Sequence, residues 1–283
     1  MIYNCKLIAS MMIYEQKLGS RWGDIASQYD EYRLSPPEEL IQWIHSYTGN
    51  GEHVNLVADL GCGTGKSTRP WNSFAKNVIG IDPSEKLLNV ANNNNTYTNV
   101  SFKMGFGAET GLPDNSVDIV TAMHSIHWME PNSTLVEILR MLKNGGIFAM
   151  YGHELAPTSQ YLEVEKEIFI LKSKIRNLAI YHELESNIMH LNIMDFGKFT
   201  EEKKCFEYSR YFNFSNIITW TANDYLGWIY TLGNVQKLLS DFKISEEELG
   251  LNQFEKTLKK CFKNDANELL INWKIYLFKN KII

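Results

Sequence analysis

The sequence predicts an α/β protein built on a doubly wound sheet that is mostly parallel, has an antiparallel last strand, and carries a helical insertion covering its site. Three observations lead to this expectation. Short apolar runs alternate with helical segments between residues 54 and 151, as in parallel βα units. A turn rich in glycine follows the first of these runs. The last apolar segment, residues 271–278, alternates with a period of two, which indicates an antiparallel strand.

The 283 residues divide into four expected parts. Residues 1–50 are expected to form N-terminal helices, because a pair of prolines separates two helical patterns there. These helices are also expected to serve as a lid. Residues 51–152 form the ligand-binding core. The composition changes after this point, so residues 153–245 are expected to be an insertion that covers the substrate. Residues 246–283 supply the last helix and the last strand of the core sheet.

The core contains five short apolar runs that predict buried strands, with helical segments between some of them. The expected strands are 54–60, 77–82, 100–104, 117–122 and 146–151. The expected helices are 65–75, 84–92 and 132–142.

The second half has a different pattern. About fifty residues after Tyr151 are rich in Ile, Leu, Glu and Lys and look helical, and residues 206–214 are aromatic-rich and strand-like. Two further helices are expected to begin at Thr221 and Ser245, each of which precedes an acidic residue by three positions, as in a capping box.

Composition and charge exclude several classes of protein. Hydrophobic residues make up 44% of the chain and charged residues 22%, which excludes a disordered, collagenous or coiled-coil chain. The formal net charge of −5 argues against a nucleic-acid partner, since such proteins usually carry a clustered basic surface. No apolar run approaches the roughly 18 residues of a membrane-spanning helix, so no membrane partner is expected. A small-molecule partner fits best, and the oligomeric state is left open.

The cysteines and the N-terminus favour a cytoplasmic location. The spacing of the four cysteines fits neither a paired metal-ligand set nor a dense disulfide framework, so free thiols and no metal are expected. Residues 1–13 are followed by no small-residue cleavage site, which argues against a secretory signal. Translation could start at Met1, Met11 or Met12. The cysteines are Cys5, Cys62, Cys205 and Cys261.

The glycine-rich turn is the sharpest functional feature. Residues 59–65 read DLGCGTG, and such glycines let the chain turn tightly and let a ligand approach the backbone. The helix expected after the turn would direct free N–H groups towards an acceptor or an anion. Asp82 ends the next expected strand, where a carboxylate can accept hydrogen bonds from both hydroxyls of a ribose. These features predict a ligand that contains a nucleoside.

The glycine spacing separates two cofactors. A dinucleotide loop has the spacing G-x-G-x-x-G, whereas this turn has G-x-G-x-G and continues with Lys66, so NAD and a nicotinamide oxidoreductase are disfavoured. The turn instead resembles the first motif of the class I S-adenosylmethionine-dependent methyltransferases, whose fold is Rossmann-like. The resemblance covers roughly residues 20–152 and the last strand, with Asn144 where the family usually has proline. The segments similar to the family's later motifs are residues 80–84, 107–113, 118–120 and 139–146.

The resemblance implies S-adenosylmethionine as cofactor, S-adenosylhomocysteine as product and no metal. His127 with Trp128, and the segment from Tyr29 to Arg33, are similar to a branch that methylates small molecules, such as the trans-aconitate methyltransferases. The implied cofactor contacts are Asp59, Gly61, Cys62, Gly63, Asp82, Pro83, Ser84, Leu87, Gly107, Ala108, Glu109, Met123 and His124. The implied substrate contacts are Trp22, Trp128, Tyr225 and Trp228.

The chemistry of the acceptor decides whether a base is needed. A carboxylate needs none, whereas a hydroxyl or a ring nitrogen bearing a proton does; His127 is then the first candidate and His124 the second. Tyr29 and Arg33 would close the site from the N-terminal helix, and Arg33 could alternatively hold an acidic substrate. Each has a structural alternative: a hydrogen-bonding role for the histidines, helix packing for Tyr29 and a surface ion pair for Arg33.

The expected function is methyl transfer to an oxygen, nitrogen or carbon of a small metabolite. The aromatic residues of the second half, Tyr225 and Trp228 among them, and Trp128 could alternatively be core residues. Two other functions stay open: methylation of RNA or protein, and binding of S-adenosylmethionine without catalysis. The sequence does not name the acceptor, because fold and cofactor motifs are shared by many chemistries.

Overall fold

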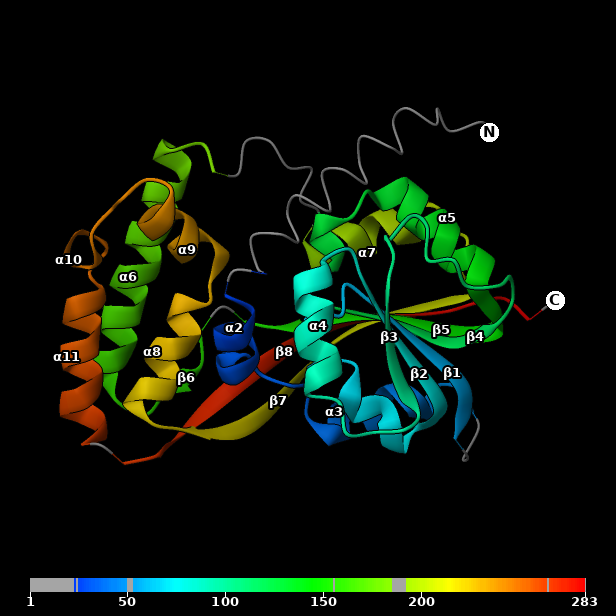
Figure 1. The fold of residues 1–283 in the computed structure, drawn as a ribbon, viewed down its shortest axis with the longest axis horizontal. Coiled ribbons are helices and arrows are strands. Elements are labelled where there is room, and N and C mark those ends of the chain that lie inside the picture. Colours follow the sequence, from blue (N-terminus) through cyan, green and yellow to red (C-terminus); the bar gives the residue numbers. More distant parts are fainter. Residues whose placement is uncertain are drawn as a thin grey trace.

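The computed structural model describes residues 23, 25–49, 53–154, 156–184, 192–263 and 265–282. These residues form an eight-stranded sheet in the order β3-β2-β1-β4-β5-β8-β6, with β7 paired to β8 (Figure 1). The strands are β1 (Val54–Leu60), β2 (Ala75–Asp82), β3 (Val100–Met104), β4 (Val117–Met123), β5 (Leu142–His153), β6 (Thr158–Ser159), β7 (Tyr208–Trp220) and β8 (Asn267–Lys279).

The pairing confirms the predicted mixed sheet. The pairs β1–β2, β1–β4, β2–β3 and β4–β5 are parallel. The last strand β8 runs antiparallel to β5 and β7. The chain order reverses between β1 and β4, and in open α/β sheets this is the place where ligands bind at the carboxyl ends of the strands. The fold therefore directs attention to the ends of β1, β2 and β4.

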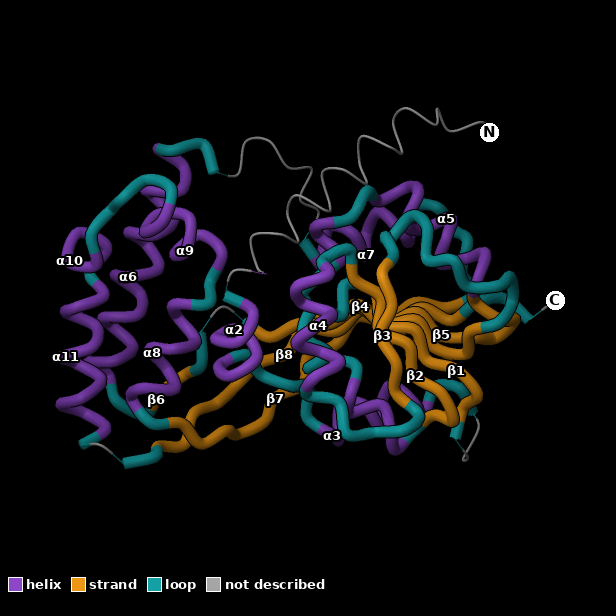
Figure 2. Tube along the Cα trace, viewed as in Figure 1, coloured by secondary structure: helices purple, strands orange, loops and turns teal. Residues whose placement is uncertain are grey.

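Helices cover both faces of the core sheet (Figures 1 and 2). The helix α3 (Glu38–Ser46) buries Leu40, Ile41 and Ile44 in a cluster with residues of β1, β2 and β8. On another side lie α5 (Pro131–Met141) and α7 (Ile193–Glu202), which contribute Ile138 and Phe196 to a second cluster. The helix α4 (Glu85–Asn93) follows β2 and is capped by the Ser84 side chain, as the sequence indicates.

The prediction of a helix at residues 65–75 is wrong. The chain turns through residues 61–68 and then forms a short 3₁₀-helix, η1 (Arg69–Ser73), before β2 begins at Ala75. Pro70 explains the difference, because it has no N–H to donate and disfavours the α conformation of the residue before it. No long helix dipole therefore points at the glycine-rich turn.

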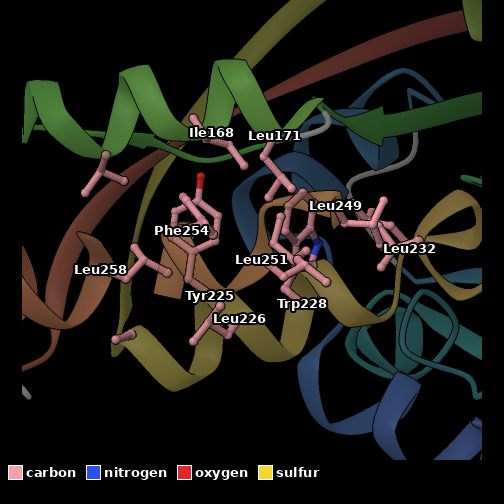
Figure 3. Close-up of a cluster of buried hydrophobic side chains, with 14 of the residues drawn as sticks. Ile168, Leu171, Tyr225, Leu226, Trp228, Leu232, Leu249, Leu251, Phe254 and Leu258 are labelled. Atoms are coloured by element: carbon pink, nitrogen blue, oxygen red, sulfur yellow. The ribbon is translucent and has the colours of Figure 1, made fainter. Parts of the chain in front are cut away.

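A second group of helices forms a cap on one end of the sheet (Figure 1). The cap helices bury a common core, and Figure 3 shows Tyr225, Trp228 and Phe254 within it. The predicted helix after Ser245 is split in two by Gly250, which has a φ of 91°. No described helix is long and apolar enough to cross a membrane. The cap helices are α6 (Leu162–Tyr181), α8 (Ala222–Tyr230), α9 (Gly233–Ser240), α10 (Glu246–Leu249) and α11 (Leu251–Phe262).

The structure groups the second half differently from the expected parts. The expected insertion, residues 153–245, contributes β7 to the main sheet and α7 to the core, so it is not a separate cover. The helix α11, expected with residues 246–283 to complete the core, instead packs in the cap against α6. The reason is the length of β7 and β8, which pair along thirteen residues and carry one sheet from the core into the cap.

The N-terminal helix α2 (Ala26–Tyr32) joins the core to the cap. On the core side, Asp30 forms an ion pair with Arg69 at 3.2 Å and accepts a hydrogen bond from the Asn94 amide. On the cap side, Arg33 Nη2 donates to the carbonyl oxygen of Thr231 at 2.8 Å. These contacts hold α2 between the core and the cap. Its role as a lid stays a prediction.

Gly227 permits the close contact between α2 and α8, since a Cβ there would collide with the ring of Tyr32. We expect Gly227→Ala to lower the free energy of unfolding by roughly 1–3 kcal/mol, the usual cost of overpacking. Urea unfolding measures this change. The double variant Gly227→Ala/Tyr32→Ala removes the obstructing ring and should lose less than the sum of the two single losses. Additive losses would show that the collision is not the cause.

Candidate active site

A cavity of about 1320 Å³ lies between the carboxyl ends of the core strands and the cap. Its core wall is formed by the ends of β1, β2, β4 and β5 and by the loops after them. Its other walls come from α2, from α8 and α9, and from the start of α7. A recess of about 30 Å³ at the glycine-rich turn is lined by some of the same residues.

The glycine-rich turn is fixed by its own amides. The N–H groups of Gly61 and Cys62 both donate to the carbonyl oxygen of Ile81, at 2.7 and 3.1 Å. The N–H of Gly63 donates to Asp82 Oδ2 at 2.9 Å. The expectation that these three amides hold a ligand directly therefore needs correction, because they already tie β1 to β2. Gly61 and Gly63 still line the cavity with bare backbone.

Asp59 is fully buried and is not among the residues that line the cavity. Its carboxylate accepts hydrogen bonds from the hydroxyls of Ser67 and Thr68, both at 2.6 Å, and of Thr121 at 2.8 Å. Burial raises its pKa, and the three hydroxyls oppose that shift. The prediction that Asp59 contacts the cofactor directly is therefore wrong, because Asp59 does not line the cavity. Its hydrogen bonds instead stabilise the conformation of the glycine-rich turn.

Asp82 lies where the sequence predicts, on the cavity wall at the end of β2. Its two oxygens accept hydrogen bonds from the N–H groups of Gly63 and Ser84, each at 2.9 Å. Burial raises the pKa of this carboxyl group to about 6. Since a carboxylate has about four acceptor positions, two remain for the hydroxyls of a ribose.

The predicted adenosine contacts fall into two sets. Pro83, Leu87 and Gly107 line the cavity. Ser84 is buried as the cap of α4, while Ala108 and Glu109 form a tight turn beside the wall but are not among its lining residues. This turn is anchored by Glu137 of α5, whose Oε1 accepts from both the backbone N–H and the hydroxyl of Thr110.

Most of the predicted substrate and catalytic residues line the cavity, but not all of them do. Met123, His124, His127, Trp128, Tyr29, Arg33 and Trp228 all line the cavity. Tyr225 does not: it is buried in the cap core, and its hydroxyl donates to the carbonyl oxygen of Pro157 at 2.9 Å. The prediction that Tyr225 contacts the substrate is therefore wrong. Trp22 lies outside the described residues.

His124 is held in one orientation. It adopts a φ of 51°, and its ring packs against Gly152, where a Cβ would lie 2.7 Å from ring carbon Cε1. Its Nε2 accepts a hydrogen bond from the backbone N–H of His153 at 2.9 Å. Burial, with the positive charges nearby, lowers its pKa well below the usual value. Because Nε2 is engaged as an acceptor, His124 is a poor candidate for the base.

Sequence reasoning missed His153, Glu154 and Ser125, which also line the cavity. The Ser125 hydroxyl donates to the carbonyl oxygen of Leu60 at 2.6 Å and so joins the ends of β4 and β1. His153 ends β5, next to His124, with ring centroids 4.3 Å apart. The signal was available, since residues that follow a buried parallel strand lie at the ligand-binding edge.

The turn and the recess fit the amino-acid end of S-adenosylmethionine. A Cβ at Gly63 would meet no atom within 4 Å, so the backbone there borders open space. Among the recess residues, the buried atoms Arg33 Nε and Thr64 Oγ1 have no hydrogen-bond partner in the described part of the chain. A group with a carboxylate and an ammonium supplies both the acceptor and the donor that such atoms need.

The fold and the site together define an α/β protein with a cavity at the carboxyl ends of β1, β2 and β4. Residues 58–150 match a family model described as a methyltransferase domain. This segment of the chain is therefore similar to methyltransferase domains, and it lies in a sheet that is mostly parallel.

The relatives agree with this assignment. The chain is 31% identical over 131 residues to a probable S-adenosylmethionine-dependent methyltransferase of Saccharomyces cerevisiae, covering 44% of each chain. It is 27% identical over 139 residues to a putative methyltransferase of Dictyostelium discoideum, covering 49% of this chain and 51% of the relative. The matched part thus spans about half the length of these curated relatives.

The fold recurs in solved structures. A putative type II methyltransferase from Anaeromyxobacter dehalogenans superimposes with a TM-score of 0.62 at 19% identity, covering 89% of this chain and 99% of that one. At this identity, the similarity establishes the fold alone. The substrate and the partners of this chain must be inferred from its own site.

The raised pKa of Asp82 predicts that cofactor affinity depends on pH. Ribose hydroxyls donate to the ionised carboxylate, so binding favours that form and weakens as the pH falls below about 6. We expect the dissociation constant of S-adenosylhomocysteine to rise by up to about tenfold per pH unit below that value. Titration calorimetry between pH 8 and pH 5 measures this. Asp82→Asn should give a flat profile over the same range, and an equal slope in both proteins would contradict the assignment.

Proposed function

We propose that the chain transfers a methyl group from S-adenosylmethionine to a small metabolite bound between the core and the cap. The observation that carries this proposal is one continuous cavity with Asp82 at its cofactor end and Trp128, Trp228 and His127 on its other walls. When bound, S-adenosylmethionine supplies an activated methyl group on sulfur.

The protein's own part is to position the reactants and to exclude water. Asp82 holds the ribose, and the glycine-rich turn fixes the amino-acid end beside Arg33 of α2. The side chain of Met123 and the aromatic residues of the cap cover the reacting centre. The contacts of α2 with both the core and the cap keep this enclosure shut.

The acceptor is a small molecule in this proposal because the cap covers the cavity. An RNA or protein acceptor would need an open surface, and an RNA would also need a basic one; the net charge is −5. The free thiols Cys62, Cys205 and Cys261 support a reducing compartment, and we place the reaction in the cytoplasm. Cys5 lies outside the described residues. Membership of the trans-aconitate branch stays a prediction.

The experiment combines binding with transfer. Titration calorimetry should show that S-adenosylmethionine and S-adenosylhomocysteine both bind to the purified protein. A panel of small hydroxylated, carboxylated and heterocyclic compounds is then assayed for formation of S-adenosylhomocysteine. Binding without turnover on any acceptor would favour the non-catalytic alternative. Retention of RNA on filters with a steep salt dependence would favour the macromolecular one.

A further inference from the structure

His153 is placed at the junction of the cofactor recess and the large cavity, and it lines both. It ends β5 beside His124, which directly follows β4, and the ring of Trp228 from α8 lies with its centroid 6.0 Å away. Gly61 and Met123 line the same recess. His153 therefore borders both the recess at the glycine-rich turn and the large cavity.

The hydrogen bonds of His153 fix its tautomer. Its Nδ1 lies 2.8 Å from the carbonyl oxygen of Glu154. A carbonyl oxygen only accepts, so Nδ1 carries the proton and Nε2 carries a lone pair. Nε2 is buried and has no partner among the described residues, although a buried acceptor is normally paired. Nε2 of His153 is therefore a buried hydrogen-bond acceptor that has no donor among the described residues.

The two neighbouring histidines have opposite roles. In His124 the acceptor Nε2 is already used by the His153 backbone, so its neutral ring offers an N–H from Nδ1. His153 offers a lone pair instead. Of these two histidines, only His153 can therefore receive a proton without first breaking a hydrogen bond of its ring.

Its surroundings keep His153 neutral at physiological pH. Burial and the positive charge of Arg33 lower its pKa to about 4. Other titratable groups in this region are His124 directly after β4, His127, and the ion pair of Glu154 with Lys274 of β8, at 3.3 Å. That pair is close to neutral overall, so it does not counteract Arg33.

We propose that His153 Nε2 receives the proton of the methyl acceptor, and that the acceptor is a molecule with a hydroxyl group at the reacting oxygen, such as a phenol. This inference rests on the proposed function and specifies its substrate class. The product is a methyl ether, S-adenosylhomocysteine and a proton carried by the imidazole.

The step balances in atoms and charge. A lone pair of the acceptor oxygen forms the new C–O bond while the C–S bond breaks and its electron pair stays on sulfur. The O–H electron pair stays on oxygen, and the proton moves to His153 Nε2, from which it later passes to water. The positive charge on sulfur is lost as the imidazolium forms, so the enclosed site keeps the same net charge.

The weak basicity of His153 determines which chemical class of methyl acceptor can give it a proton. As the C–O bond forms, the oxygen becomes positively charged and its proton strongly acidic, so even a base with a pKa of about 4 accepts it. An alkylammonium group, with a pKa of about 10 like that of lysine, would not give up its proton to such a base. A carboxylate would bring a second lone pair to Nε2 and make no hydrogen bond there. A hydroxyl is the acceptor that the site fits.

The first test measures directly which ring nitrogen of His153 carries the proton. In the ¹⁵N-labelled protein saturated with S-adenosylhomocysteine, imidazole NMR spectra should show His153 with its proton on Nδ1 and a bare Nε2 at neutral pH. Phenol as probe should shift the Nε2 signal, and benzoate should not. A proton on Nε2, or no response to phenol, would overturn the proposal. Failure of S-adenosylhomocysteine to bind at all would instead refute the proposed function.

Variants test the role in turnover. With an active hydroxyl acceptor, His153→Gln should lower kcat by about 100-fold or more, the usual contribution of a base, while the dissociation constant of S-adenosylhomocysteine stays unchanged. His45→Gln on α3, away from the cavity, is the control and should change neither quantity. Loss of cofactor binding in His153→Gln would make His153 a cofactor ligand and overturn the proposal. So would loss of turnover in His127→Gln with full turnover in His153→Gln.

Discussion

Asp82→Ala should abolish measurable binding of S-adenosylmethionine and S-adenosylhomocysteine, with a loss of at least about 100-fold in affinity. Two hydrogen bonds from ribose hydroxyls to a carboxylate are each worth about 1.5–3 kcal/mol, and 1.4 kcal/mol corresponds to a factor of ten. The substitution also frees the N–H groups of Gly63 and Ser84, which now donate to Asp82. Titration calorimetry of the variant with both ligands measures the loss.

Two controls separate the role of the carboxylate from general damage. Asp82→Asn keeps the side-chain volume and one acceptor oxygen, so its affinity should lie between those of the wild type and Asp82→Ala. Asp265→Ala removes an exposed acid that does not line the cavity, and it should leave binding unchanged. Full affinity in a folded Asp82→Ala protein would mean that the ribose lies elsewhere.

Residue type and strand position were enough to predict that Asp82 lies on the cavity wall, while its contact with a ribose stays a prediction. A carboxylate directly after a buried parallel strand next to a glycine-rich turn has few other places to point, because parallel strands end at one edge. Asp59 shows why the same reasoning fails one strand earlier. It lies inside β1, and its carboxylate binds the hydroxyl of Thr121 on the neighbouring strand β4 instead of reaching the cavity. The sequence does not show this contact, because the two strands are far apart in the chain.

The cap was harder to predict for a related reason. Tyr225 and Trp228 are three residues apart on α8 and share one face of that helix, yet only Trp228 reaches the cavity. The distinction depends on how α8 packs against α6 and α11, a contact between segments far apart in the chain. His153 was missed for a simpler reason: the strand predicted at 146–151 ends two residues before the observed end of β5.

The fold by itself does not decide the reaction. The same fold can carry many different reactions. What favours methyl transfer here is the matched domain together with the site. The site has the Asp82 carboxylate on the cavity wall, a turn with bare backbone, and buried polar atoms without hydrogen-bond partners among the described residues. Each of these features can be tested separately, as the variants above do.

Asp59→Ala should destabilise the whole core rather than merely weaken the site. The loss should be about 2–4 kcal/mol in the free energy of unfolding, because buried hydroxyls lose a charged acceptor. The three donors are Ser67, Thr68 and Thr121, all of them buried. Together they connect the turn after β1 to β4. Urea unfolding with a fixed m-value gives the change in stability.

Asp59→Asn is the informative partner, because it keeps the shape and removes the charge. Burial raises the pKa of Asp59, so the native state binds this proton more tightly than the unfolded state does. The wild type should therefore gain stability relative to Asp59→Asn as the pH falls through the raised pKa, and lose that gain as the pH rises again. Urea unfolding of both proteins across that range measures the difference. If Asp59→Asn were as unstable as Asp59→Ala, the negative charge itself would hold the turn. If Asp59→Ala were as stable as the wild type, the three hydroxyls would have found other partners and the turn would not depend on Asp59.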